Sequence, residues 1–360
     1  MYIHEQKTWP NFTWDPELIT KLLGAVRHRQ GKILGQMQAL GFKLQEETML
    51  KTLTMDVTKS SEIEGELLHP EQVKSSIARR LGIEIAGIIK AERNVEGIVE
   101  MMLDATQKYD LPLTADRLFD WHAALFPTGR SGMQKIKTAA WREDAMQVTS
   151  GPIGKETIHF EAPAAAKVPT EMTLLLEWIA HEENLDPVLK AALAHLWFIT
   201  IHPFDDGNGR IARAITDMLL ARADKTPQRF YSMSTQIQAE RNQYYDILES
   251  TQKGDLDVTK WLVWFLECLM VTMDQTDQII TKTRARTHFW EKQKDTVFNG
   301  RQQKILHLLL DDFFGNLSVS KYAKITKTST DTALRDLQDL VKKEVLEQQG
   351  SGRSTSYRLK

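Results

Sequence analysis

The chain has 360 residues, of which 42% are hydrophobic, 26% are charged and one is a cysteine, and its formal net charge is −2 at pH 7. These values describe a globular protein of two or three domains and exclude a polycationic nucleic-acid-binding chain, an intrachain disulfide and any multi-cysteine metal site. No apolar run approaches the roughly 20 residues of a membrane span, and the first residues lack a secretory signal, so we expect a cytoplasmic protein.

The hydrophobic pattern is helical through most of the chain. A first helix is expected after Asp15, a good N-cap, with Pro16 at the first helical position. Further helices are expected at 46–59, 73–78, 83–109, 116–125, 168–181, 187–201, 209–223, 239–251 and 258–283. Residues 145–163 instead alternate in polarity and predict a short β-hairpin that turns around 151–154.

The last part of the chain predicts a separate unit. Residues 301–360 show three helical segments and a hairpin around 350–352, which is the layout of a winged helix. This segment has 11 Lys/Arg against 7 Asp/Glu. We therefore divide the chain into an N-terminal helical region (1–110), a core (111–275), a linker helix (276–300) and a winged-helix domain (301–360).

The stretch HPFDDGNGR (202–210) separates two apolar helices with polar residues. Pro203 cannot continue a helix, so the preceding helix should end near His202. Gly207 and Gly209 free the backbone for a tight turn, and a new helix should begin around 208–209. The first amides of a helix have no internal partners and carry the positive dipole end, so they form a site for an anion such as phosphate.

Charged side chains of this stretch add catalytic groups to the anion site. Arg210 and Arg213 share one face of the new helix, where two cations oppose the dipole unless an anion lies between them. Asp206 is placed to hold a divalent cation, and His202 stands at the rim as a general base. The alternative is a capped turn between core helices with solvated arginines. A Walker A loop is excluded because no Gly-Lys-Ser/Thr follows, and zinc fits poorly because no third ligand accompanies His195 and His202.

The run HPFDDGNGRIAR matches the signature of the Fic family, His-Pro-Phe-x-Asp/Glu-Gly-Asn-Gly-Arg-x-x-Arg. The resemblance implies an adenylyltransferase that moves AMP from ATP to a hydroxyl of a target protein. In that role His202 takes the proton of the hydroxyl, Asp206 holds Mg²⁺ and Arg213 meets the γ-phosphate. The phosphates would be cradled by Gly207, Asn208, Gly209 and Arg210.

Two further segments fit the same resemblance. The hairpin would be the flap that aligns the target segment, through Thr157, Ile158, His159 and Phe160. The adenine would be covered by Tyr244 and Tyr245, with a polar contact from Gln252. A plain surface hairpin and core aromatic residues are the alternatives. The N-terminal WPNFTWD and the C-terminal unit resemble the larger bacterial Fic proteins of the SoFic type.

The stretch SSEIEG (60–65) resembles the Fic inhibitory motif, Ser/Thr-x-x-x-Glu-Gly/Asn. Ser60 and Glu64 share a helix face, and Gly65 leaves room for close approach of another segment. By resemblance, Glu64 would pair with Arg213 and occupy the γ-phosphate position, within an inhibitory helix over about 56–66. The alternative is a solvated acidic helix end.

The sequence thus predicts a mainly α protein: a Fic helical bundle with a β-hairpin flap and a C-terminal winged helix. The predicted activity is ATP- and Mg²⁺-dependent AMP transfer to a Ser, Thr or Tyr hydroxyl of a target protein or of the chain itself, autoinhibited by Glu64. Three alternatives stay open: transfer of another phosphate-containing group, removal of AMP, and formation of a homodimer. Proteins of the Doc type, which transfer phosphate, have a lysine at the position of Gly209, so the glycine favours transfer of AMP. A non-enzymatic alternative is a DNA-binding regulator acting through 328–343, where Asp331, Asp336 and Asp339 would repel phosphates.

Overall fold

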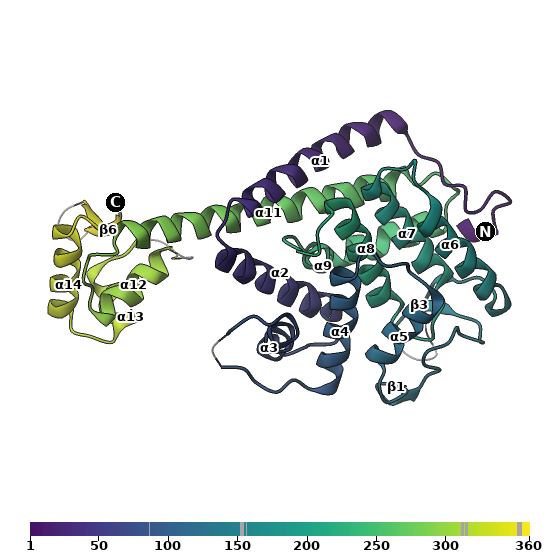
Figure 1. Cartoon of the computed structure of the whole chain (residues 1–360), viewed down its shortest axis with the longest axis horizontal. Helices are drawn as coiled ribbons and strands as arrows, with labels where there is room; N and C mark the ends of the chain where they lie inside the picture. Colours follow the sequence, from purple (N-terminus) through teal and green to yellow (C-terminus); the bar gives the residue numbers. More distant parts are fainter. Residues whose placement is uncertain (86, 152–154, 156, 311–312, 314–315, 351–354) are drawn as a thin grey trace. The chain divides into compact units, whose positions relative to one another are not determined.

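The computed structural model describes residues 1–85, 87–151, 155, 157–310, 313, 316–350 and 355–360. The chain forms two compact units, Met1–Thr276 and Asp277–Lys360. Both are built mainly of α-helices, with strands only in antiparallel pairs among the described residues, which confirms the predicted fold class at the level of a mainly α protein (Figure 1). Within the described ranges, no helix combines the length and the apolar character needed to cross a bilayer.

The first unit holds most of the helices. They are α1 (Pro16–Gln38), α2 (Phe42–Ile63), α3 (Pro70–Leu81), α4 (Arg93–Gln107), α5 (Ala115–Leu125), α6 (Val168–His181), α7 (Pro187–Ile201), α8 (Asn208–Asp224), α9 (Met233–Ala239), α10 (Arg241–Gln252) and the first part of α11 (Thr259–Lys292). Its strand pairs are β1 (Arg130–Ser131) with β2 (Gln134–Lys135), and β3 (Gln147–Ser150) with β4 (Thr157–Glu161). Short 3₁₀ turns form at η1 (Ile3–Glu5) and η2 (Ala165–Lys167).

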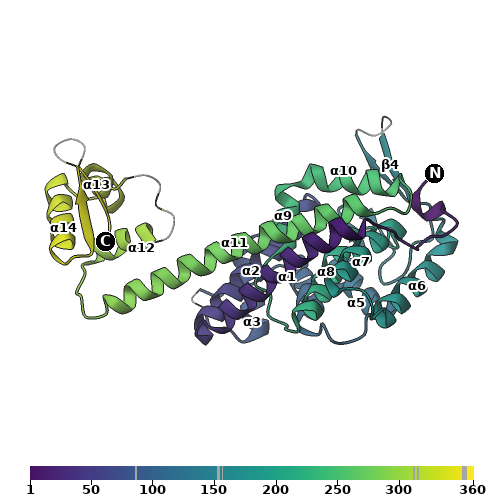
Figure 2. The same cartoon turned by 90° about the horizontal axis from the view of Figure 1, so that it is seen from above.

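Helices α7 and α8 form the centre of the first unit. Nearly every residue of both helices is buried. Helix α7 is mostly apolar around its circumference, as is typical of an interior helix, whereas α8 also buries charged side chains, among them Arg210, Arg213 and Asp217. They pack on each other more extensively than any other pair of elements within the described structure, and both views show them among the other helices of the first unit (Figures 1 and 2). Residues 202–207 of the polar stretch therefore connect two buried helices, and Asn208 begins the second of them.

Local sequence signals set several helix ends where we expect them. The Asp15 side chain accepts hydrogen bonds from the first amides of α1, and Pro16 opens that helix. The bounds of α6 and α7 agree with the predicted 168–181 and 187–201. The β3–β4 hairpin is also confirmed, while residues 152–154 of its expected turn lie outside the described residues.

One helix prediction is wrong and one helix was not predicted. The helix expected over 83–109 begins only at Arg93, because Gly82 ends α3 in the left-handed conformation and Gly87 again has a positive φ. The helix expected over 239–251 is confirmed as α10 (Arg241–Gln252), but the separate helix α9 before it, which Ser232 caps, was not predicted. In addition, α11 continues to Lys292, well beyond the expected end at 283 and into the segment interpreted as a linker helix.

The second unit contains α12 (Gly300–Leu310), α13 (Val319–Thr326), α14 (Thr330–Lys342) and the antiparallel strands β5 (Leu346–Gln349) and β6 (Ser356–Leu359). Its core includes Ile305, Leu306, Leu317, Tyr322, Ala333, Leu337, Leu340, Val345, Leu346 and Tyr357. The three helices and the hairpin are thus present, with 351–352 of the expected turn outside the described residues. The assignment to the winged-helix fold stays a prediction.

Asp336 is directed into the second unit and is not part of an exposed acidic surface of α14. It is 7% exposed and accepts hydrogen bonds from Asn299, Arg301 and Tyr322. Hydrogen bonds from Asn299, Arg301 and Tyr322 keep the pKa of its carboxyl below the ordinary value, although burial opposes this. Its expected role in repelling phosphates is therefore not supported by its position.

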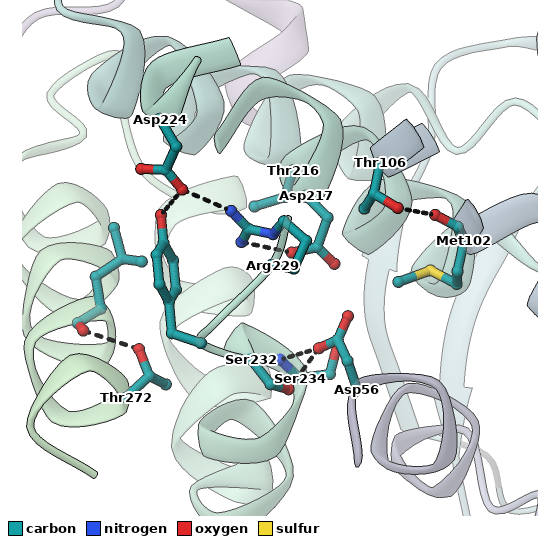
Figure 3. A network of polar contacts seen from close by, with 12 residues as sticks. Asp56, Met102, Thr106, Thr216, Asp217, Asp224, Arg229, Ser232, Ser234 and Thr272 are labelled. Atoms are coloured by element: carbon teal, nitrogen blue, oxygen red, sulfur yellow. Dashed lines mark hydrogen bonds and ion pairs between the residues drawn. The ribbon is translucent and has the colours of Figure 1, made fainter. Parts of the chain in front are cut away.

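Buried polar contacts join α2 to the core of the first unit (Figure 3). Asp56 of α2 accepts hydrogen bonds from the hydroxyl of Ser232 at 2.5 Å and the amide of Ser234 at 3.3 Å. Beside it, Arg229 pairs with Asp217 of α8 at 3.1 Å and with Asp224 at the end of that helix at 3.0 Å. Burial raises the pKa of Asp217 well above its ordinary value, and the neighbouring Asp56 carboxylate raises it further. The positive charge of Arg229 lowers this pKa but does not cancel the increase.

We expect Asp217→Asn to change how stability depends on pH. The folded protein keeps a proton on Asp217 that the unfolded chain releases above about pH 4, so the free energy of unfolding falls as pH rises, by up to about 1.4 kcal/mol per unit. Asparagine needs no proton, so the stability of the variant relative to the wild type should increase as the pH rises above about 4 in urea unfolding. The exposed Asp120→Asn should follow the wild-type curve, and a parallel curve for Asp217→Asn would contradict the assignment.

Candidate active site

The turn between α7 and α8 places His202 in an unusual backbone conformation. Its φ of 51° and ψ of 60° are left-handed, and its amide still donates to the carbonyl of Phe198 at 3.0 Å, which ends α7. A non-glycine residue in this region costs of the order of 1–3 kcal/mol, and the following Pro203 disfavours helical conformations further. The surrounding contacts must therefore hold this residue in place.

The imidazole of His202 has a defined protonation pattern. Its Nδ1 lies 3.2 Å from the carbonyl oxygen of Ile199, and a carbonyl can only accept, so Nδ1 carries the proton and Nε2 is left as a base. Burial lowers the pKa of the ring to about 4, and the nearby Arg142 lowers it too, whereas the Ile199 carbonyl, Glu64 and Asp206 raise it. The ring is therefore neutral at physiological pH and able to accept a proton.

A pocket of about 470 Å³ opens beside this turn. Its wall combines the turn with the end of α2, the β3–β4 hairpin and α10. Most of the predicted site residues line it: Glu64, His159, Phe160, His202, Asp206, Gly207, Asn208, Gly209, Tyr244, Tyr245 and Gln252. Thr157 and Ile158 lie on β4 but do not line the pocket, and Arg210 and Arg213 lie on α8 behind its first residues.

The start of α8 leaves no room for side chains at its two glycines. Gly207 has a φ of 81°, and a Cβ atom there would lie 2.8 Å from the Phe126 ring. At Gly209 a Cβ atom would lie 2.1 Å from Oε1 of Glu64, so the Glu64 carboxylate lies directly against the first turn of the helix. The side chain of Asn208 bonds to the amide and carbonyl of Phe204 at 3.0 and 2.8 Å, so only its backbone amide can face a ligand.

Arg213 is buried and connects α8 to the end of α2. It is 1% exposed; its Nη2 donates to Oε1 of Glu64 at 2.7 Å, and its Nε donates to the hydroxyl of Ser60 at 2.9 Å. A further bond from Nη2 reaches the carbonyl of Ser60 at 2.8 Å. Gly65 follows with a φ of 83°. Within the described structure Nη1 of Arg213 has no hydrogen-bond partner, so this buried cation keeps one free donor.

Glu66, two residues after Glu64, forms an ion pair with Arg210. This contact was not predicted from the sequence. Nη1 of Arg210 donates to Oε2 of Glu66 at 2.9 Å, and the guanidinium lies 5.0 Å from the ring centre of Phe126. The amide of Asn94 donates to the other oxygen of Glu66 at 3.1 Å. Both arginines at the start of α8 are thus neutralised by the segment after α2.

Asp206 is held from two neighbouring segments. Ser131 of β1 donates to its Oδ2, and His122 of α5 lies 3.2 Å from its backbone carbonyl. The Nδ1 of His122 accepts from the amide of Ala139 at 3.2 Å, so its Nε2–H is the donor to Asp206. Burial lowers the pKa of His122 to about 4, which keeps this neutral form. No pattern in the sequence connects these residues, because 75 and 84 positions separate Ser131 and His122 from Asp206.

The two aromatic residues predicted to cover a base differ in how firmly they are held. The hydroxyl of Tyr244 donates to Nε2 of the buried His195 at 2.9 Å, since Nδ1 of that ring bonds to Thr216. Tyr245 is only half-buried and faces the guanidinium of Arg241, 5.0 Å from its ring centre. One wall of the pocket is thus fixed from the core and the other is open to solvent.

The flap contacts α10 through a histidine at its centre. His159 bonds to Glu249 of α10 through Nδ1 at 2.6 Å and to Ser150 of β3 through Nε2 at 2.6 Å. Hydrogen bonds from Lys253 and His159 lower the pKa of Glu249. Ser150 and Glu249 line the pocket and were not predicted, because only their position opposite His159 reveals them.

Comparison with known families fits this geometry. Residues 112–220, which include the whole polar turn, match the family model described as the Fic/DOC family. The chain therefore contains a Fic domain over these residues. Residues 2–83, which include α1, α2 and the SSEIEG stretch, match a second family model, described only as a domain of unknown function, DUF4172.

Named relatives of the Fic domain share part of the sequence. The chain is 34% identical over 112 residues to a protein named protein adenylyltransferase Fic from Drosophila yakuba, and 33% identical over 112 residues to one of that name from Culex quinquefasciatus. Each match covers 29% of this chain and 21% of the relative. The chain therefore spans about a fifth of the length of these curated relatives.

Solved structures show the same fold over a larger part of the chain. A Fic family protein from Desulfovibrio desulfuricans G20 aligns with a TM-score of 0.55 and 21% identity over 98% of both chains. A fragment of Fic-1 from C. elegans aligns with a TM-score of 0.52 and 18% identity over 74% of both chains. At this level of identity the likeness concerns the fold, and it confirms that the mainly α arrangement is that of Fic proteins.

Proposed function

We propose that this Fic-domain protein transfers AMP from ATP to a Ser, Thr or Tyr hydroxyl of a target protein, with His202 as the general base. In this reaction the hydroxyl oxygen forms a bond to the α-phosphorus while its proton passes to Nε2 of His202. The bond between the α-phosphorus and the bridging oxygen breaks, and pyrophosphate leaves. The neutral ring, protonated on Nδ1, supports this role.

The start of α8 provides the proposed phosphate site. The first amides of the helix, including those of Asn208 and Gly209, have no helical partners and carry the positive dipole end, while the amide of the N-cap Gly207 donates to Oδ1 of Asp206. Once Glu64 and Glu66 are displaced, the guanidinium groups of Arg213 and Arg210 would add positive charge, and Nη1 of Arg213 has no partner within the described residues. Phosphoryl transfer depends mainly on positioning and charge neutralisation, and these groups supply both.

Asp206 is the residue that would hold Mg²⁺. The described residues contain no cluster of three or more His, Cys, Asp or Glu side chains that could bind a metal alone. Mg²⁺ is commonly held by one or two carboxylates together with substrate phosphates, and the 41% exposed side chain of Asp206 at the pocket fits that pattern. When bound, Mg²⁺ would neutralise phosphate charge.

The remaining pocket walls fit the nucleotide and the target. Tyr244 and Tyr245 would cover the adenine, with Gln252 in polar contact from the same helix. Strand β4, from Thr157 to Glu161, would pair with an extended segment of the target, because a two-stranded sheet leaves edges that can accept a further strand.

Glu64 is proposed to inhibit the enzyme in the state described here. Its carboxylate lies against Gly209 and pairs with Arg213, which is where a terminal phosphate would bind. An arginine that is positioned to donate hydrogen bonds to a phosphate can donate them to a carboxylate in the same geometry when phosphate is absent. This placement of an anion at the start of α8, beside a neutral histidine, is the observation that carries the proposal.

Glu66 is proposed to strengthen this inhibition, because it neutralises Arg210 as Glu64 neutralises Arg213. We expect Glu64→Gly/Glu66→Gln to bind ATP more tightly than Glu64→Gly by about two- to fivefold, since a partly exposed ion pair contributes up to about 1 kcal/mol. Calorimetric titration with ATP measures this. The surface variant Glu71→Gln in the Glu64→Gly background is the control, and equal affinities of all three proteins would exclude a role for Glu66.

Labelled ATP tests the proposed reaction. In the Glu64→Gly variant, label on the α-phosphate should appear on protein, and label on the γ-phosphate should not. Label from the γ-phosphate alone would show phosphate transfer, and label from neither would reject transferase activity under these conditions.

A further inference from the structure

Arg142 is a buried cation outside the Fic signature, and it binds the end of α7. It is 2% exposed, its Nε donates to the carbonyl of His202 at 2.8 Å, and its Nη2 lies 3.4 Å from the carbonyl of Ile201. Its own backbone amide donates to the carbonyl of Pro203 at 2.9 Å. Three consecutive carbonyls around the catalytic histidine thus accept from one residue.

The same guanidinium also holds both ends of the flap. Nη1 donates to the carbonyl of Asp144, just before β3, at 2.8 Å. Nη2 donates to the carbonyl of Pro163, just after β4, at 2.5 Å. Within the described part of the chain Arg142 makes no salt bridge, so its donors serve only backbone carbonyls. A planar group with five donors can join the flap and the histidine turn in this way, and a lysine cannot.

The histidine turn needs such support. The last carbonyls of a helix have no partners within it, and a cation near them also complements the negative end of the helix dipole. His202 adopts a left-handed conformation before a proline, which persists only where the surroundings enforce it. The bond from Nδ1 of His202 to Ile199, which leaves Nε2 as the base, depends on that conformation.

We propose that Arg142 is a positioning residue for the transfer reaction: it holds the His202 turn and both ends of the flap in one fixed arrangement. The general base and the strand that aligns the target then keep a constant relative position. This inference rests on the proposed AMP transfer for its kinetic test, whereas the geometry of His202 can be tested without any activity.

Arg117 offers a matched control. It also binds the end of a helix, because its Nη2 donates to the carbonyls of Asp104 at 2.9 Å and Lys108 at 3.0 Å near the end of α4. It does not line the site pocket. Loss of either arginine should therefore lower stability, but only loss of Arg142 should displace the catalytic groups.

The kinetic test uses Arg142→Gln, Arg142→Lys and Arg117→Gln in the Glu64→Gly background. We expect Arg142→Gln to lower kcat by about 100-fold, with KM for ATP changed by less than about threefold, because a displacement of about 1 Å has effects of this size. Arg142→Lys should recover part of the rate, and Arg117→Gln should keep kcat within about threefold at a similar loss of Tm. Equal kcat in Arg142→Gln and Arg117→Gln would overturn the proposal.

The second test needs no activity and uses ¹⁵N NMR of the histidine rings, with His202 assigned from its loss in His202→Gln. The parent should show a neutral ring protonated on Nδ1, and Arg142→Gln should show mixed tautomers. An unchanged pattern would overturn the proposal. If Arg142→Gln does not fold, Arg142→Lys takes its place in both tests. If the Glu64→Gly parent transfers no AMP, the proposed function fails, and the NMR result still decides the role of Arg142.

Discussion

Replacing Glu64 with glycine is expected to raise AMP incorporation into protein by about 10- to 100-fold. The Glu64 carboxylate, 31% exposed, accepts from the buried Arg213 at 2.7 Å, and ATP must displace it before the γ-phosphate can bind. A hydrogen bond to a charged group contributes roughly 1.5–3 kcal/mol, and each 1.4 kcal/mol corresponds to a factor of ten. Ser60 continues to hold Arg213 in the variant, so the phosphate-binding group stays in place.

The matched control is Glu62, an acidic residue two positions before Glu64 that has other partners. Its carboxylate bonds to Lys59 at 2.6 Å and to Gln238 at 3.2 Å. Glu64→Gln should activate the enzyme, whereas Glu62→Gln should change incorporation by less than about fivefold, as expected for a partly exposed pair. The same incorporation in wild type and Glu64→Gly would remove autoinhibition from the mechanism.

His202→Ala in the Glu64→Gly background is expected to lower AMP incorporation by about 10²- to 10⁴-fold. The hydroxyl then loses the base that takes its proton, while the phosphate site at the start of α8 remains. ATP affinity, measured by calorimetry, should therefore change by less than about threefold. Mass spectrometry of the protein and of lysate incubated with ATP and Mg²⁺ measures the transfer.

His181→Ala is the control for this loss, because it removes an exposed imidazole at the end of α6, outside the pocket. It should retain the rate of the Glu64→Gly parent. Full activity of His202→Ala would show that another group accepts the proton, and the assignment of the general base would be wrong.

The features that the sequence predicts well are those with short-range signals. Pro16 and Pro187 open helices after aspartate caps, and Pro203 follows the end of α7, so these ends follow from local chemistry. The motif also brings its functional groups together over a few residues, and most of them line one pocket. Local chemistry fails at Gly87, where a positive φ breaks a segment that is apolar enough to predict a longer helix.

The features that the sequence does not reveal depend on contacts between distant segments. Glu66 meets Arg210 across 144 positions, and Arg142 meets His202 across 60. Neither contact leaves a periodic or motif signal, because each depends on how α2 and the flap pack against the α7–α8 hairpin. An isolated arginine such as Arg142 has the same appearance in the sequence as any surface arginine until its carbonyl partners are known.

A crystal structure of Glu64→Gly soaked with ATP and Mg²⁺ tests the mechanism most directly. It should show the triphosphate at the first turn of α8, with the γ-phosphate on Arg213 and the α-phosphorus within reach of a hydroxyl activated by His202. Density for the triphosphate at another place on the protein, with the start of α8 empty, would contradict both the proposed transfer and the proposed inhibition.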